Sequence, residues 1–216
     1  MYIFVIHLNK NAMKNYILGL LILISVNGTA QKINFGVKAG LNMSMLTGSK
    51  DLIMSSNNGF FAGTLLEFKL LGKIAIQPEL LFSAQGAKFE SKDLTYATTT
   101  KMNYLILPVM VKYYPVAGLF VEAGPQVGFL ISSRQDIDNR ITNVSTSENI
   151  KEVTKDFDMS INAGVGYDIL DKVVAQVRYC IGLTNTSTLE NTDVKNGVFQ
   201  LSVGYKWCIQ LINANC

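Results

Sequence analysis

Histidine is almost absent from this sequence. The single histidine among the 216 residues is His7, and it lies in a segment that we expect to be removed on export. Ser–His catalytic triads, histidine-dependent acyl transfer and histidine-bound zinc are therefore excluded for the mature chain. We expect a protein that is not an enzyme and that has no cofactor, no metal site and no catalytic residues.

Cysteine is also scarce. The three cysteines are Cys180, Cys208 and Cys216, and an odd number allows at most one internal pair. Cys180 falls in the middle of an expected strand, too far from Cys208 for a disulfide. A Cys208–Cys216 pair and a fully reduced set both remain open. No CxxC motif or Cys/His cluster indicates a metal.

The sequence has few charged residues and no long apolar run outside its N-terminal segment. Charged residues make up 16% of the chain, against about 25% in soluble proteins, although 49% of the residues are hydrophobic. No internal run approaches the roughly 18 apolar residues of a membrane-spanning helix. The net charge of +3 is too small to predict nucleic-acid binding. Neither a typical soluble domain nor a helical membrane protein fits this composition.

The N-terminal segment has the pattern of an export signal. Lys10 and Lys14 precede the apolar run Tyr16–Val26, and the small residues at 27–30 follow it. This order of charge, short apolar core and small-residue exit is typical of a signal peptide. We expect residues 1–30 to be removed, with translation starting at Met1 or Met13. A retained N-terminal anchor is the alternative.

Most of the remaining sequence alternates apolar and polar residues. In Ile33–Ser44 the odd positions are apolar and the even positions are glycine or polar, and Phe157–Ile169 follows the same rule. A period of two places successive side chains on opposite faces of a sheet. The chain therefore predicts a sheet with one continuous apolar face and one continuous polar face.

Eight such strands are expected. Their ranges are Ile33–Ser44, Gly59–Leu70, Lys73–Gln85, Met102–Tyr114, Leu119–Ser132, Phe157–Ile169, Val173–Asn185 and Val198–Ile209. Long polar connections at 45–58, 86–101, 133–156 and 186–197 alternate with short turns at 71–72, 115–118 and 170–172. An even number of strands with alternating connection lengths is typical of an up-and-down transmembrane barrel. The predicted fold class is all-β, an eight-stranded antiparallel transmembrane β-barrel spanning 31–209, with 210–216 as a C-terminal tail.

The polar face of the expected strands carries charges of both signs at one depth. They lie three to six residues from the nearest short turn or chain end, and they are Lys38, Glu67, Glu79, Glu122, Arg178 and Lys206. An eight-stranded lumen is narrow and is filled by side chains. Paired charges are tolerated there, whereas isolated ones are costly. We expect these six residues to form one structural, ion-paired layer inside the barrel.

Aromatic residues on the apolar face fall into two groups, as expected of the two interfaces of a membrane barrel. Phe35, Phe68, Tyr113, Tyr167, Tyr205 and Trp207 are near the short-turn end, and Phe60, Phe82, Phe129, Phe157 and Phe199 are near the long-loop end. Two alternative folds fit these observations less well. A lipocalin-like soluble barrel would have to bury an apolar face too large for its lumen, and a two-sheet sandwich does not require export or alternating connection lengths.

Several segments resemble one family when they are taken together and in order. They are Gly36–Asn42, Gln77–Leu81, Asn103–Pro108, Glu122–Pro125, Arg178–Tyr179 with Gly182–Asn185, and Leu201–Lys206. They are similar to the PorT-like outer-membrane β-barrel family (outer membrane protein beta-barrel domain), over about Phe35–Trp207. The resemblance implies an eight-stranded barrel in the outer membrane of a gram-negative bacterium. One namesake of the family takes part in protein secretion. Cys208–Cys216 departs from the family by extending past the terminal aromatic residue.

We therefore expect a non-enzymatic outer-membrane protein that serves as a structural or interaction module. Its long loops would be extracellular and its termini periplasmic. Its expected partners are outer-membrane lipid, the barrel-insertion machinery, and secretion-system or envelope proteins, with no nucleic acid. An accessory subunit of a secretion system and a narrow channel are the alternatives. A lipid-modifying enzyme is disfavoured by the missing histidine.

Overall fold

The computed structural model describes residues 32–47, 53–70, 72–90, 96–139, 142, 144–151, 156–184 and 195–209. The expected signal peptide and the C-terminal tail 210–216 lie outside these residues. Among the residues described, no helix is both long and apolar enough to cross a membrane.

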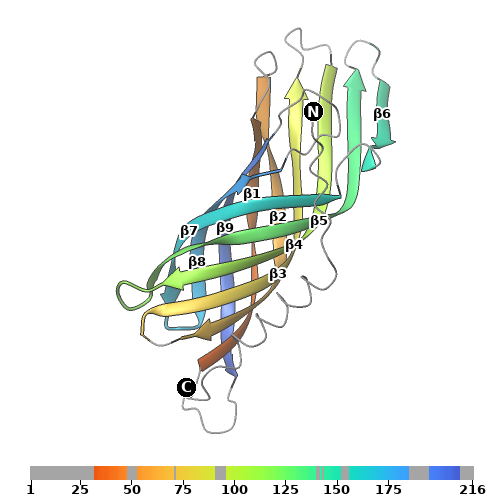
Figure 1. Cartoon of the computed structure of the whole chain (residues 1–216). Coiled ribbons are helices and arrows are strands. Elements are labelled where there is room, and N and C mark those ends of the chain that lie inside the picture. The colour runs from red at the N-terminus through yellow and green to blue at the C-terminus, as the bar shows by residue number, and fades with distance from the viewer. Residues whose placement is uncertain are drawn as a thin grey trace, which may run out of the picture.

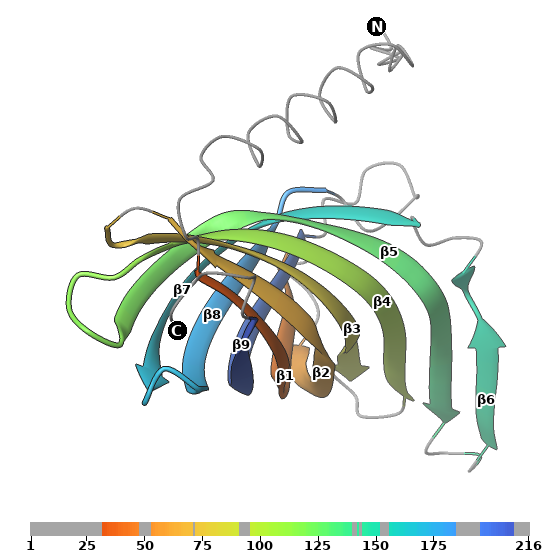
Figure 2. The same cartoon turned by 90° about the horizontal axis from the view of Figure 1, so that it is seen from below.

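Nine strands form a single antiparallel sheet. They are β1 (Lys32–Thr47), β2 (Ile53–Lys69), β3 (Ile74–Glu90), β4 (Tyr96–Tyr113), β5 (Leu119–Asn139), β6 (Val144–Asn149), β7 (Phe157–Ile169), β8 (Val173–Gly182) and β9 (Lys195–Ile209). The sheet order is β4-β3-β2-β1-β9-β8-β7-β5-β6, and β4 also pairs with β5. Eight strands thus close a barrel, and β6 lies outside it beside β5 (Figures 1 and 2). The predicted eight-stranded antiparallel barrel is confirmed.

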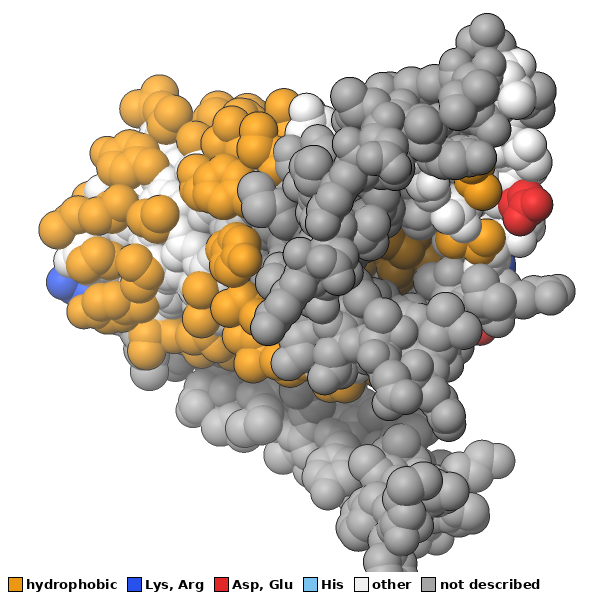
Figure 3. Space-filling view, turned by 90° about the horizontal axis from the view of Figure 1, so that it is seen from above, with side chains coloured by type: hydrophobic (Ala, Val, Ile, Leu, Met, Phe, Trp, Pro, Cys, Tyr) orange, Lys and Arg blue, Asp and Glu red, His pale blue; other side chains and the backbone are white. Residues whose placement is uncertain are grey.

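The two faces of the barrel wall differ in the way that the alternation predicts. Val203 is 59% exposed, while its neighbour Ser202 is 3% exposed. Leu66 likewise points outward, and Leu65 points into the barrel. Figure 3 shows hydrophobic side chains spread over the barrel wall with few charged side chains among them. The apolar face of the strands therefore points outward, which is the arrangement of a barrel whose solvent is lipid.

Three short turns join strands at one end of the barrel, which we call the short-turn end. Gly72 and Gly118 adopt positive φ angles of 77° and 81° there, a conformation that glycine adopts at little steric cost. In the third turn Leu170 and Asp171 also have positive φ angles, of 52° and 58°, and the N–H of Lys172 donates to the carbonyl of Ile169. Both central residues of this two-residue hairpin turn are therefore left-handed, as a type I′ turn requires.

At the opposite end, several strands continue much further than the sequence predicts. Segments 53–58, 86–90, 96–101 and 133–139 are strand, although they fall in stretches expected to be long loops. Residues 144–149 form β6, which was not expected at all. We call 53–58, 86–90, 96–103 and 132–139 together with β6 the sheet extension; its strands rise past the barrel in Figure 1.

The sheet extension lacks a sequence signal for a physical reason. In the barrel wall one face meets lipid and the other meets the lumen, so the sequence must alternate. Beyond the wall both faces lie outside the apolar band, and polar residues suit both of them. Stretches such as 96–101 and 133–139 then have the composition of loops, although Thr has good strand propensity.

Candidate functional site in the barrel lumen

All six charged residues selected from the sequence lie inside the barrel. Each is at most 4% exposed, and the set is Lys38, Glu67, Glu79, Glu122, Arg178 and Lys206. Each comes from a different strand, namely β1, β2, β3, β5, β8 and β9, so six of the eight barrel strands contribute one charged side chain each. Successive side chains of a strand point to opposite faces. The residues next to these six are mostly exposed apolar residues of the outer wall, so the six charged side chains point inward.

Arg178 is the centre of the first group of contacts. Its Nη1 and Nη2 donate to Glu79 Oε2 and Oε1 at 3.0 and 2.9 Å, and its Nε donates to Glu122 Oε1 at 2.8 Å. Lys38 Nζ reaches both oxygens of Glu79, at 3.0 and 2.9 Å. Gln77 Nε2 donates to Glu79 Oε1 at 2.6 Å. The paired fork of a guanidinium and a carboxylate is the geometry of strong charge-assisted hydrogen bonds.

Glu67 and Lys206 belong to a second group. Lys206 Nζ lies 3.1 Å from Glu67 Oε2 and 2.6 Å from Asp168 Oδ2. Lys112 Nζ lies 3.4 Å from Glu67 Oε2 and 3.9 Å from the centre of the Phe120 ring. Tyr114 Oη lies 2.9 Å from Glu67 Oε2 and 3.1 Å from Asp168 Oδ2, so its single hydroxyl proton is shared between the two carboxylates. This group adjoins the short-turn end, where Tyr114 follows directly after β4.

The lumen therefore holds two ion-paired groups, where the sequence predicted a single layer of six. Lys112 and Asp168, buried at 0% and 4% exposure, complete a balance of four acidic and four basic side chains. Both occupy inward-facing positions in the alternation of their strands, and this alternation is the sequence feature that could have identified them. They were missed because each lies one residue from the end of its strand, Lys112 on β4 and Asp168 on β7, which is nearer the turn than the depth that defined the expected layer.

Apart from Asp158, which accepts a hydrogen bond from Thr184 Oγ1, the remaining described lumen is filled by neutral side chains. Asn42 Nδ2 donates to Ser83 Oγ at 2.9 Å, and Gln200 Nε2 donates to Asn42 Oδ1 at 3.0 Å. On the β2–β5 side, inward-facing apolar residues form a cluster of Phe61, Leu81, Met102, Tyr104, Ile106 and Leu130. A Cβ at Gly40 would lie 2.8 Å from the Phe61 ring, so glycine on β1 gives that ring its space.

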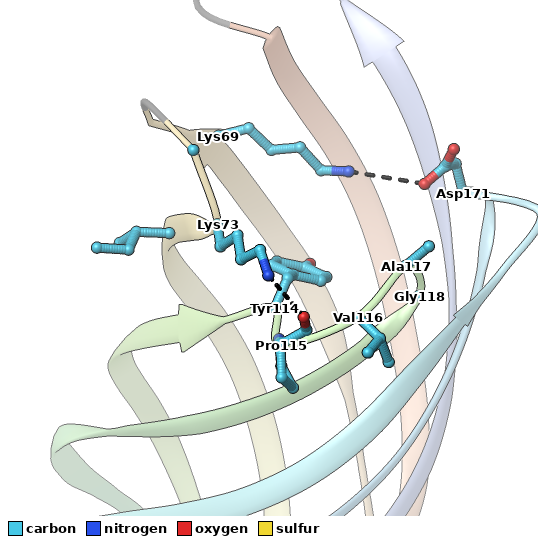
Figure 4. A pocket seen from close by; sticks show the side chains of 10 residues that line it. Lys69, Lys73, Tyr114, Pro115, Val116, Ala117, Gly118 and Asp171 are labelled. Carbon is cyan, nitrogen blue, oxygen red and sulfur yellow. Dashed lines mark hydrogen bonds and ion pairs between the residues drawn. The ribbon is translucent and has the colours of Figure 1, made fainter.

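The short-turn mouth of the lumen is covered by Tyr114 and Lys69. Lys69 Nζ lies 5.4 Å from the centre of the Tyr114 ring and 3.7 Å from Asp171 Oδ1, across the mouth (Figure 4). Lys73 Nζ donates to the carbonyl of Pro115 at 2.8 Å. A pocket of about 340 Å³ lies on the outer side of this cover and is lined partly by these residues. Tyr114 thus separates the charged lumen from the space outside.

The two ion-paired groups do not supply a free acid or base. Each of their four carboxylates has a cation within 3.1 Å: Arg178 for Glu79 and Glu122, and Lys206 for Glu67 and Asp168. A general base must accept a proton from a substrate, whereas each of these four carboxylates is held by a buried cation and is closed off from the space outside; Glu122 Oε2 and Asp168 Oδ1 are buried without a hydrogen-bond partner in the described part of the chain. Asp158, nearer the long-loop end, is half-buried and accepts a hydrogen bond from Thr184 Oγ1, with no cation beside it among the described residues. Within the described residues, no group of three or more His, Cys, Asp or Glu side chains could hold a metal ion. Cys180 is a buried free thiol.

The closed eight-stranded barrel, its apolar outer wall and its charged interior define an integral β-barrel protein of the outer membrane. Residues 29–188 match the model of the family described as outer membrane protein beta-barrel domain. The chain belongs to this family. The match does not distinguish PorT-like members from other members, so that finer resemblance stays an expectation. No curated protein matches the sequence.

Solved structures that share the fold include two bacterial surface proteins. The attachment invasion locus protein Ail of Yersinia pestis, solved with the heparin analogue sucrose octasulfate, is 16% identical and superposes with a TM-score of 0.51, covering 82% of this chain and 99% of Ail. Neisserial surface protein A is 14% identical with a TM-score of 0.51, covering 80% of this chain and 97% of its own. At these identities the likeness concerns the fold alone.

Proposed function

We propose that this protein is a non-enzymatic interaction module of the outer membrane, which holds the sheet extension outside the membrane for contact with other envelope proteins. One observation carries the proposal: β2, β3, β4 and β5 continue past the apolar band, and β6 joins them at the edge. Outer-membrane barrels have their short turns on the periplasmic side, so the extension would be extracellular and both termini periplasmic.

The edge strand β6 gives the extension a means of contact. Among the described residues β6 pairs with β5 alone. The N–H of Ile150 donates to Ser133 on β5. Because backbone groups alternate sides along an antiparallel strand, the N–H and C=O groups of Ser145, Ser147 and Asn149 face away from β5. Such an edge is a template to which an extended segment of a partner can pair.

The test is affinity capture from solubilised outer membranes with the tagged full-length protein, comparing wild type with Ser145→Pro and Ser145→Ala. Proline removes one outward N–H and blocks strand addition, whereas alanine keeps it. We expect one or more envelope proteins to be captured by the wild type and by Ser145→Ala, and to be lost with Ser145→Pro. Equal capture by all three forms would contradict contact through β6. Absence of any specific envelope protein would contradict the interaction role itself.

Conductance across planar bilayers separates this proposal from the narrow channel. The two ion-paired groups, the apolar cluster and Tyr114 fill the lumen at successive depths, which supports a closed interior. We expect the reconstituted wild type to show no steady single-channel current. A reproducible current that depends on ion charge would favour the channel instead.

A further inference from the structure

A polar pocket lies on the outer face of the sheet directly beyond the apolar band. On β4 the outward residues Leu105 and Leu107 are 37% and 38% exposed, and the next two outward positions toward the extension are Asn103 and Lys101. A pocket of about 280 Å³ opens at this level and is lined by Lys101, Asn103, Ser132, Ser133, Arg134 and Asn149. It is therefore placed where the lipid-facing wall ends.

A β-bulge brings the pocket residues of β5 to the outer face. Asn103 pairs with Ser132, but Tyr104 pairs with Leu130, so Ile131 has no partner on β4. The extra residue shifts the alternation of β5. Ile131 and Ser132 are both exposed, and Arg134 faces outward beside Lys101.

The charges of the pocket are not balanced. Lys101 and Arg134 are directly opposite each other in the β4–β5 register, and like charges in that position repel. Asp136 compensates Lys101, with Lys101 Nζ 2.8 Å from Asp136 Oδ2. Asp136 also accepts a hydrogen bond from Ser147 Oγ at 2.7 Å. Among the residues that the structure describes, Arg134 has no ion-pair or hydrogen-bond partner, so one cation is left over.

We propose that this pocket binds the phosphate group of a phosphorylated lipid in the adjacent membrane leaflet. The guanidinium of Arg134 presents a planar fork that suits two phosphate oxygens. Lys101 adds a second cation, and the Asn149 amide and the Ser132 hydroxyl supply neutral donors at the wall of the pocket. The exposed side chains of Leu105, Phe129 and Ile131 lie just below, where the acyl chains of the same lipid would pack. A soluble phosphate would make no use of that apolar floor.

The inference rests on the proposed function only in placing the sheet extension just outside the membrane. Native mass spectrometry of the detergent-solubilised full-length barrel would count bound lipid, with bisphosphorylated lipid A as the probe. Lipid A stripped of its phosphates and inorganic phosphate are the two comparison ligands. We expect the phosphorylated lipid to bind and both comparison ligands to bind at least about tenfold more weakly.

Variants then assign the binding to the pocket. Arg134→Gln should weaken binding about tenfold or more, because the charge-assisted hydrogen bonds from the guanidinium fork to the phosphate are lost. Arg134→Lys should recover part of it, because it keeps the charge and loses the fork. Lys172→Gln, at an exposed cation of the short-turn end, is the matched control and should bind normally. Circular dichroism in detergent verifies that each variant is folded.

Three results would overturn the inference. Unchanged binding by folded Arg134→Gln would show that the lipid is held elsewhere. Equal binding of the dephosphorylated lipid would show that the acyl chains alone are recognised. Equal binding of inorganic phosphate would contradict a lipid ligand. None of these results bears on capture through β6, so failure here is distinct from failure of the proposed interaction role.

Discussion

Arg178 and Glu79 are joined across the full width of the barrel. They are 99 residues apart in the sequence, and in the closed sheet three strands separate β8 from β3 in either direction. The two hydrogen bonds from the guanidinium to the carboxylate therefore tie opposite walls of the lumen together. A contact of this kind fixes the shape of the barrel interior as well as its charge balance.

Loss of the Arg178 side chain should destabilise the barrel strongly. Arg178→Ala leaves Glu122 without its cation and Glu79 with Lys38 alone, and removal of one partner from a buried pair costs about 3–5 kcal/mol. Urea unfolding in detergent, followed by circular dichroism, measures this cost. Glu79→Ala should behave similarly, and the double variant should cost less than the sum of the two single changes. Simple additivity would mean that the pair does not interact in the folded protein.

The outward direction of β9 can be tested with a charge placed in lipid. Val203→Arg lies in the middle of the strand and should cost about 2–4 kcal/mol, because arginine is poorly solvated near the bilayer midplane. Ile209→Arg, on the same face at the end of the strand, should cost about 0–1 kcal/mol. Refolding into lipid bilayers with urea titration gives both values. Equal costs would show that Val203 does not face the centre of the membrane.

The turn between β7 and β8 should be open to stabilisation. Leu170 has a φ of 52° and is 88% exposed. Its backbone is therefore in the left-handed region, which is unfavourable for leucine, and its side chain makes little packing contact that would offset this cost. Leu170→Asn should raise the free energy of unfolding by up to about 1 kcal/mol, since asparagine tolerates this conformation better than leucine. Leu170→Val should have the opposite effect. The midpoint of urea unfolding in detergent reports both changes.

Acid should loosen the contact between β4, β5 and β6 in the sheet extension. The hydrogen bond from Lys101, followed by that from Ser147, lowers the pKa of the Asp136 carboxyl below its ordinary value. A carboxyl whose pKa is lower in the folded state stabilises that state above its unfolded pKa, and the contribution is lost as the pH falls through the folded pKa. NMR titration of Asp136 should show the lowered midpoint. Lys101→Gln should move it upward, and an unchanged midpoint would contradict the contact.

The residues of the lumen and of the outer wall could be predicted from the sequence. Each barrel strand has lipid on one side and the polar lumen on the other, so its apolar and polar residues must alternate. The same alternation that exposes Val203 and buries Ser202 also predicts that Lys38 and Glu79 point into the interior. The contacts themselves were not accessible. Whether Glu67 meets Arg178 or Lys112 depends on the stagger between strands and on the tilt of the barrel, and neither appears in the pattern of a single strand.

The apolar cluster around Phe61 and the strand β6 were not predicted for two different reasons. Phe61 lies at an inward position flanked by outward Phe60 and Ala62, so two adjacent aromatic residues obscure the alternation there. In β6 every described side chain is exposed, and a strand with both faces in water has no hydrophobic period to detect.

The unpaired residue Ile131 sets a phase difference between the two parts of β5. Up to Ile131 the odd-numbered side chains face outward, and from Ser132 onward the even-numbered ones do so. Deletion of Ile131 would remove the bulge and join Leu130 directly to Ser132, so Arg134 and Asp136 would still face outward. A strand that instead paired regularly through Ile131 would turn Arg134 and Asp136 to the inner face, with Ser133 and Gln135 taking their places outside. The bulge thus decides which side chains β5 presents above the membrane, while the part of β5 in the barrel wall keeps its own alternation.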